Sequence, residues 1–217
     1  MTKAGENPQI RYDEGCLAAH ALNVIGDRWA LLVVRELMFV PKRFQAIRAG
    51  LPGITASVLT RRIAQLSRCG VICRVPHGTS YALTESGRDL LPVLQAMCRW
   101  GAAHPGHDPR RFISPTALMI SMTAMIGGGS DQDLAGFDFA EEKFTFRMGV
   151  NAPALVRAVD VIDAPFTLQG TGNALAHAVY GPSRLVDHIA GGLISVSGDM
   201  GAAQSFVDRF SLRQRGS

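Results

Sequence analysis

The first hundred residues alternate helical stretches with one short turn and one hairpin, and this order leaves few folds open. Apolar residues recur at helical spacing in five stretches, at about residues 17–25, 27–40, 44–51, 55–68 and 84–100. Pro52-Gly53 predicts a short turn between the third and fourth stretches. Residues 71–75 and 80–83 predict two strands around a Pro- and Gly-containing turn. The pattern predicts a mostly α winged helix-turn-helix domain with a two-stranded wing.

A composition break at residues 101–111, GAAHPGHDPRR, divides the chain of 217 residues. Gly, Pro and charge without a bulky apolar side chain are typical of a linker, although a long internal loop has the same composition. Residues 1–105 carry 13 basic and 7 acidic side chains, and residues 106–217 carry 9 and 11. We therefore expect two domains, residues 1–103 and 112–217, of which only the first suits a polyanion.

The fourth helical stretch has the two faces of a DNA-reading helix. Ala56, Leu59, Ile63 and Leu66 share one apolar face. The side chains expected to contact DNA from this stretch are Thr55, Ser57, Thr60, Arg61, Gln65 and Arg68, with Arg62 on the flank. Arg pairs with guanine and Gln with adenine in the major groove, so this face predicts base readout. A merely solvated polar face is the alternative.

Basic residues flank this helix on both sides in the sequence. Lys42 and Arg43, at the start of the third helix, are expected to hold DNA phosphates. Arg74 and His77 on the hairpin could reach the minor groove or the backbone, although His77 also fits an ordinary exposed turn residue.

Motifs for catalysis, metal binding and membrane insertion are missing from the sequence. Its four cysteines and six histidines fit no standard metal-ligand spacing, and no nucleophile elbow, phosphate loop or dinucleotide fingerprint occurs. We therefore expect no enzyme activity, no cofactor and no metal. The polar N-terminal segment and the short apolar stretch at residues 115–129 predict a soluble cytoplasmic protein with no membrane partner.

Several segments of the first half resemble the HxlR-type transcriptional regulators over about residues 12–102. The segments that carry the resemblance include IGDRW at residues 25–29, LPGI at 51–54, RRI at 61–63 and YALT at 81–84. The wing, residues 76–79, is shorter than is usual in the family. The resemblance implies a DNA-binding homodimer with contacts made by the first and last helices, here Leu17, Leu90, Val93, Leu94, Met97 and Trp100. It also makes Cys16 a candidate thiol sensor, the alternative being a small buried residue in the dimer region.

The second half resembles a sterol-carrier-protein domain, which implies a smaller α/β domain with a mixed sheet. The resemblance rests on a helix from Ser114, apolar strands at residues 144–148, 155–161 and 166–170, helices at 173–179 and 182–189, and a closing strand and helix at 192–210. Such domains hold apolar molecules, and Met119, Met122 and Met125 would suit an adaptable lining. The alternative is that these methionines are ordinary core residues.

The leading hypothesis is an α+β transcriptional regulator, a repressor or an activator, that binds a pseudo-palindromic site on double-stranded DNA as a homodimer. An apolar small-molecule effector in the second domain, or modification of Cys16, would control it. The alternative is a hydrophobic-ligand carrier whose helix-turn-helix serves dimerisation only. Arg61, Arg62, Lys42 and Arg43 argue against this alternative, because a scaffold needs no basic reading face.

Overall fold

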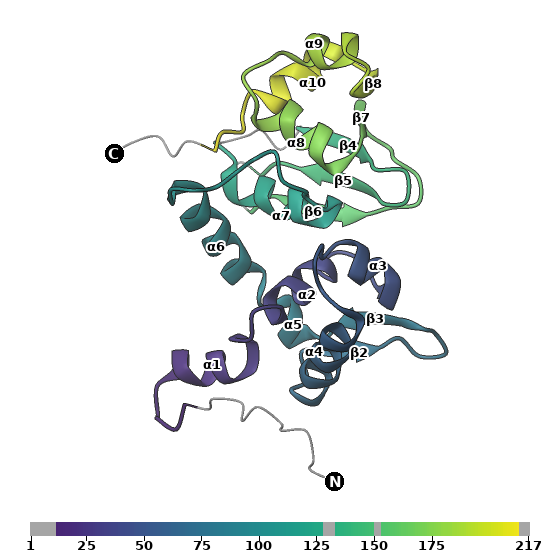
Figure 1. Cartoon of the computed structure of the whole chain (residues 1–217). Helices are drawn as coiled ribbons and strands as arrows, with labels where there is room; N and C mark the ends of the chain where they lie inside the picture. Colours follow the sequence, from purple (N-terminus) through teal and green to yellow (C-terminus); the bar gives the residue numbers. More distant parts are fainter. Residues whose placement is uncertain (1–11, 128–132, 150–152, 213–217) are drawn as a thin grey trace.

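The computed structural model describes residues 12–127, 133–149 and 153–212 (Figure 1). The elements of its first half are α1 (Leu17–Ile25), α2 (Ala30–Glu36), β1 (Lys42–Arg43), α3 (Phe44–Ala49), α4 (Ala56–Arg68), β2 (Ile72–Arg74), β3 (Ser80–Leu83), α5 (Glu85–Arg88) and α6 (Leu91–Ala103). The elements of its second half are α7 (Pro115–Met125), β4 (Leu134–Asp138), β5 (Lys143–Arg147), β6 (Leu155–Ala158), β7 (Phe166–Gly170), α8 (Gly172–Tyr180), α9 (Leu185–Ala190), β8 (Ile194–Gly198) and α10 (Met200–Val207).

The first half folds as the predicted winged helix-turn-helix. The hydroxyl of Thr55 accepts a hydrogen bond from the Val58 amide at 3.3 Å and so caps α4, as expected. Gly70 ends the helix with φ +70°, a backbone conformation that glycine adopts without a steric penalty. Leu59, Ile63 and Leu66 are buried in one cluster with side chains of α2 and α3, whereas Ala56, expected on the same face, is exposed. The apolar stripe of α4 therefore fixes which of its faces points outward.

Two details of this half differ from the sequence prediction. The wing sheet has three strands in the order β1-β3-β2, not two, because Lys42 and Arg43 pair with Tyr81 and Ser80. A strand of two residues leaves no periodicity to detect. The expected long final helix is two helices, in which Thr84 caps only α5. Pro92 lies in the first turn of α6, where its missing N–H costs nothing, and a new helix starts there.

The second half is a five-stranded mixed sheet packed against helices. Its strand order is β6-β5-β4-β7-β8, with β4 and β7 parallel and the other pairs antiparallel. The sheet is mixed, as expected, but the sequence prediction missed β4. Buried and partly buried side chains alternate along β5 and β7, so one face of the sheet packs on α7, α8 and α10.

Aromatic rings fill the space between this sheet and its helices. Phe206 of α10 lies 5.3–6.2 Å, between ring centroids, from four other phenylalanines. Met119 and Met122 are fully buried in the same cluster. These two methionines are therefore core residues, whereas Met125 borders a pocket.

Helix α7 connects the two halves. Its Leu118 and Met119 belong to the buried cluster of the second half, and its Ile120 belongs to the cluster of the first. It also packs along α6, which extends to Ala103 and so takes up part of the expected linker. Figure 1 shows α6 and α7 at the waist of the molecule, with the helix-turn-helix below and the five-stranded sheet above.

Candidate nucleic-acid interface

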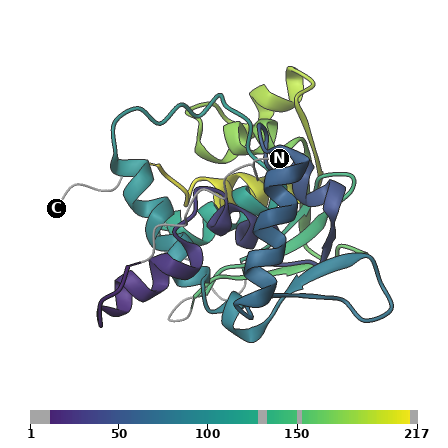
Figure 2. The ribbon, with the colours of Figure 1, turned by 60° about the horizontal axis from the view of Figure 1, so that its bottom comes forward.

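The outer face of α4 presents hydroxyl and guanidinium groups to solvent. The exposed side chains of this face are Thr55, Ser57, Thr60, Arg61 and Arg68. The Thr60 hydroxyl donates to the Ala56 carbonyl at 2.9 Å, which leaves its oxygen free to accept. In Figure 2, which brings the bottom of the molecule forward, α4 crosses the front and the β2–β3 hairpin projects beside it. These residues have the chemistry and placement that base readout requires.

Two of the predicted contact residues on this helix have structural partners instead. Gln65 is only 6% exposed, and its amide donates to the Val24 carbonyl at 3.3 Å. Its side-chain oxygen accepts a hydrogen bond from Arg62, which is also paired with Asp27. Burial lowers the pKa of Arg62 from its ordinary value. The prediction that Gln65 reads adenine is wrong, because Gln65 is buried against α1. Arg62 links α4 to Asp27, in the turn between α1 and α2.

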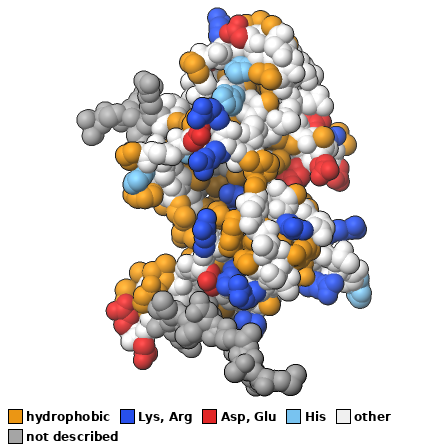
Figure 3. Space-filling view, viewed as in Figure 1, with side chains coloured by type: hydrophobic (Ala, Val, Ile, Leu, Met, Phe, Trp, Pro, Cys, Tyr) orange, Lys and Arg blue, Asp and Glu red, His pale blue; other side chains and the backbone are white. Residues whose placement is uncertain are grey.

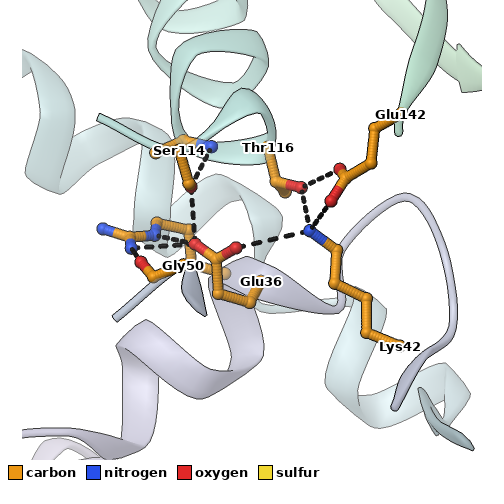
Figure 4. A network of polar contacts seen from close by, with 8 residues as sticks. Glu36, Lys42, Gly50, Ser114, Thr116 and Glu142 are labelled. Atoms are coloured by element: carbon orange, nitrogen blue, oxygen red, sulfur yellow. Dashed lines mark hydrogen bonds and ion pairs between the residues drawn. The ribbon is translucent and has the colours of Figure 1, made fainter. Parts of the chain in front are cut away.

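Lys42 is also buried, which contradicts its predicted phosphate contact. It is 5% exposed, and its ammonium group donates to Glu142 Oε1 at 2.6 Å and to Thr116 Oγ1 at 3.0 Å (Figure 4). Glu36 Oε2 lies 3.4 Å from the same nitrogen. All three donor positions of the ammonium group face protein oxygens, so Lys42 has no capacity left for DNA.

Glu36, which is fully buried, is the second centre of this network. Its Oε1 accepts hydrogen bonds from the Ser114 hydroxyl at 2.7 Å and from Arg35 Nε at 3.0 Å. Arg35 also donates to the carbonyl of Gly50, the residue that ends α3, at 3.0 Å. A Cβ at Gly50 would clash with the Glu36 carboxylate, so the packing requires glycine there. The network therefore joins α2, β1 and α3 to α7 and the β4–β5 turn.

The remaining basic candidates are exposed. Arg43 precedes α3, Arg74 lies on β2, and His77 occupies the wing turn with φ +56°. Arg48, in the last turn of α3, is also exposed and was missed by the sequence prediction. The signal for it was its place beside, and not on, the apolar face that Ile47 marks on this helix. Figure 3 shows Lys and Arg side chains over the part of the molecule that holds α4 and the hairpin.

The predicted dimer residues separate into two groups. Leu17, Val93, Met97 and Trp100 are 87%, 40%, 48% and 68% exposed, and Leu22 of α1 is 51% exposed. Leu94 is only 4% exposed and belongs to the buried cluster of its own chain, so it is not a dimer contact. Leu90 is half-buried and packs against the same cluster. Cys16, just before α1, is exposed.

The described residues contain no candidate metal centre and no single helix that could cross a membrane. No group of three or more His, Cys, Asp or Glu side chains there could hold a metal ion. Within the same ranges no single helix has the length and apolar character to cross a membrane, and α1 with α2 meets that test only as a pair bent by 72°.

The fold and the exposed face of α4 define a winged helix-turn-helix protein. The model of the HxlR-like helix-turn-helix family matches residues 24–108. An uncharacterized HTH-type transcriptional regulator of Methanothermobacter thermautotrophicus is 37% identical over 98 residues, which cover 43% of this chain and 75% of that protein. YdeP of Bacillus subtilis, also an uncharacterized HTH-type transcriptional regulator, is 40% identical over 93 residues, which cover 41% of this chain and 73% of that protein. The chain belongs to the HxlR-like helix-turn-helix family and is a DNA-binding transcriptional regulator.

A solved structure of similar sequence belongs to the transcriptional regulator YodB of Bacillus subtilis in its reduced form. It is 31% identical, covers 43% of this chain and 100% of its own, and has a TM-score of 0.38.

Lys42→Met should lower the free energy of unfolding by about 3 kcal/mol, because it leaves the carboxylates of Glu36 and Glu142 without their shared cation. Arg43→Met, at the exposed neighbouring position, should change it by less than about 0.5 kcal/mol. Urea denaturation followed by circular dichroism measures both. An equally small loss for both variants would contradict a structural role for Lys42.

Proposed function

We propose that the protein acts in the cytoplasm as a homodimeric regulator, repressor or activator, that binds a pseudo-palindromic operator. The two copies of α4 would enter successive major grooves of double-stranded DNA. The observation that carries this proposal is the outer face of α4, where Ser57, Thr60, Arg61 and Arg68 are exposed on a helix whose other face is core. Arg43 of β1 and Arg48 of α3 would hold the flanking phosphates.

Selection from a random pool of double-stranded DNA tests this proposal. The purified protein should enrich an inverted repeat whose half-site centres lie about 34–36 Å apart, or a multiple of that spacing. Enrichment of no sequence at all, or of a single half-site without symmetry, would contradict it. The enriched sequence then serves as the operator in the experiments below.

We also propose that residues 1–103 and 112–217 are two domains and that the second is a sterol-carrier-like domain. The mixed five-stranded sheet covered by α7, α8 and α10 supports this, as does its separate buried cluster. In the proposed function this second domain takes part in effector control.

Arg61→Ala should weaken operator binding by about 1–3 kcal/mol and relax sequence preference, because a bidentate contact from Arg61 to guanine would be lost. Arg157→Ala, an exposed arginine on β6, is the matched control and should leave binding unchanged. Fluorescence anisotropy on operator and random DNA distinguishes a base contact by Arg61 from a phosphate contact. Equal losses on both DNAs would mean that Arg61 contacts phosphate only.

The exposed apolar side chains of α1 and α6 support the dimer. Trp100→Glu should dissociate it and lower operator affinity in parallel, because a charge would be desolvated at the apolar contact. Val186→Glu changes an equally apolar, 58% exposed position on α9 and should stay dimeric. Light scattering at micromolar concentration measures both. A wild-type monomer, or a Trp100→Glu dimer, would contradict this surface.

Cys16 remains the proposed thiol sensor. Its exposure gives an oxidant access, and it adjoins Leu17 of the proposed dimer surface. An oxidant should change operator affinity in the wild type and not in Cys16→Ser. A response of equal size in Cys16→Ser would assign sensing to another residue.

A further inference from the structure

A pocket of about 750 Å³ lies between the two halves of the chain, outside the phenylalanine-filled core of the second half. Leu94 and Cys98 of α6 line one wall, and Ala117 and Ile120 of α7 line another. Part of α8 and the loop before α7 complete it. In Figure 3 hydrophobic side chains gather at this waist, with Lys and Arg side chains beside them. The volume falls in the range of sites for small organic molecules, about 300–1,000 Å³.

Apart from Arg35, whose charge is paired with Glu36, apolar and neutral side chains line the interior of this pocket. Its deep polar groups are the Cys98 thiol and the hydroxyls of Ser121 and Tyr180, which lie 2.8 Å apart. Burial raises the pKa of both Cys98 and Tyr180, so both side chains stay neutral. The Ser121 hydroxyl donates to the Leu118 carbonyl at 2.9 Å, so the proton between the two hydroxyls comes from Tyr180. Neither hydroxyl then has a spare donor for an anionic group.

The mouth of the pocket, in contrast, has a positive charge that no nearby carboxylate binds closely. Arg111 there is 85% exposed, and its guanidinium lies 3.8 Å from Asp108. Asp108 is already held at 2.9 Å by Arg110, whose hydrogen bonds lower the pKa of this carboxyl to about 2. His107 and His177, both exposed, line the same mouth. Arg35 lines the inner wall, but its charge is paired with Glu36.

We propose that this pocket binds a small amphipathic carboxylate, with its apolar body between α6 and α7 and its carboxylate at Arg111. The apolar interior accepts the body through burial of apolar surface. The mouth supplies the guanidinium that a carboxylate prefers as a partner. A neutral molecule of equal length would fill the same interior without the contact at the mouth.

The pocket wall continues into the network behind the helix-turn-helix. Arg35 lines the pocket and also donates to Glu36 and to the Gly50 carbonyl at the end of α3. A ligand that favours one position of α6 and α7 would therefore bias the orientation of α3 and α4. This regulatory part rests on the proposed operator binding, whereas the ligand-binding site itself does not.

Decanoate is a suitable probe, with decan-1-ol as its neutral match. A Cys16→Ser/Cys69→Ser/Cys73→Ser variant leaves Cys98 as the remaining thiol, so its alkylation by N-ethylmaleimide reports directly on the pocket. Decanoate should slow this alkylation at least threefold and raise the melting temperature. Decanoate binding with unchanged Cys98 alkylation, or no binding of either probe, would overturn the site.

Arg111→Gln tests the charge at the mouth, and Arg157→Gln, an exposed arginine away from the pocket, is its control. Arg111→Gln should weaken decanoate at least fivefold and leave decan-1-ol unchanged, whereas Arg157→Gln should alter neither. Equal affinities of the two probes for the wild type would overturn the choice of a carboxylate.

Operator affinity is measured first without a probe, which tests the proposed operator binding by itself. Saturating decanoate should then change that affinity at least threefold. A ligand that binds without any such change would confirm the site and exclude its regulatory role.

Discussion

The charge of Lys42 is the constraint on which the relation between the two halves depends. A buried ammonium group is strongly unfavourable unless anions and hydrogen-bond acceptors surround it. Lys42 finds Glu36 within its own half, but its shortest contacts are to Thr116 and Glu142, which follow it by 74 and 100 residues. Separation of the halves would leave this cation without its nearest carboxylate, so the two parts are held together by charge as well as by the apolar contacts of α7.

This constraint acts on the element that places the reading helix. Lys42 lies in β1, and α3 follows β1 without a break. At the other end of α3, Arg35 donates to the Gly50 carbonyl while also contacting Glu36. The network thus fixes both ends of α3, the first helix of the helix-turn-helix pair. We infer that movements of α7 reach α4 through these contacts.

The sequence was informative wherever local chemistry decides the structure. The Thr55 cap, the Gly70 stop and the apolar stripe of α4 depend on neighbours in the same helix, and each was predicted. Lys42 and Gln65 were misassigned, because distant residues determine their burial: α7 and the β4–β5 turn for Lys42, and the carbonyl of Val24 for Gln65. Helical spacing shows which residues share a face, but not which other element covers that face.

Hydrogen exchange of the backbone amides tests most directly whether the second half holds the helix-turn-helix in place. Glu142→Gln keeps the size of the side chain and removes its charge, and Glu141→Gln does the same at the exposed neighbouring position. Our account predicts that Glu142→Gln speeds exchange in β1 and α3 but not in β7 and β8, and that Glu141→Gln leaves all four elements unchanged. Unchanged exchange of β1 and α3 in Glu142→Gln would contradict the account.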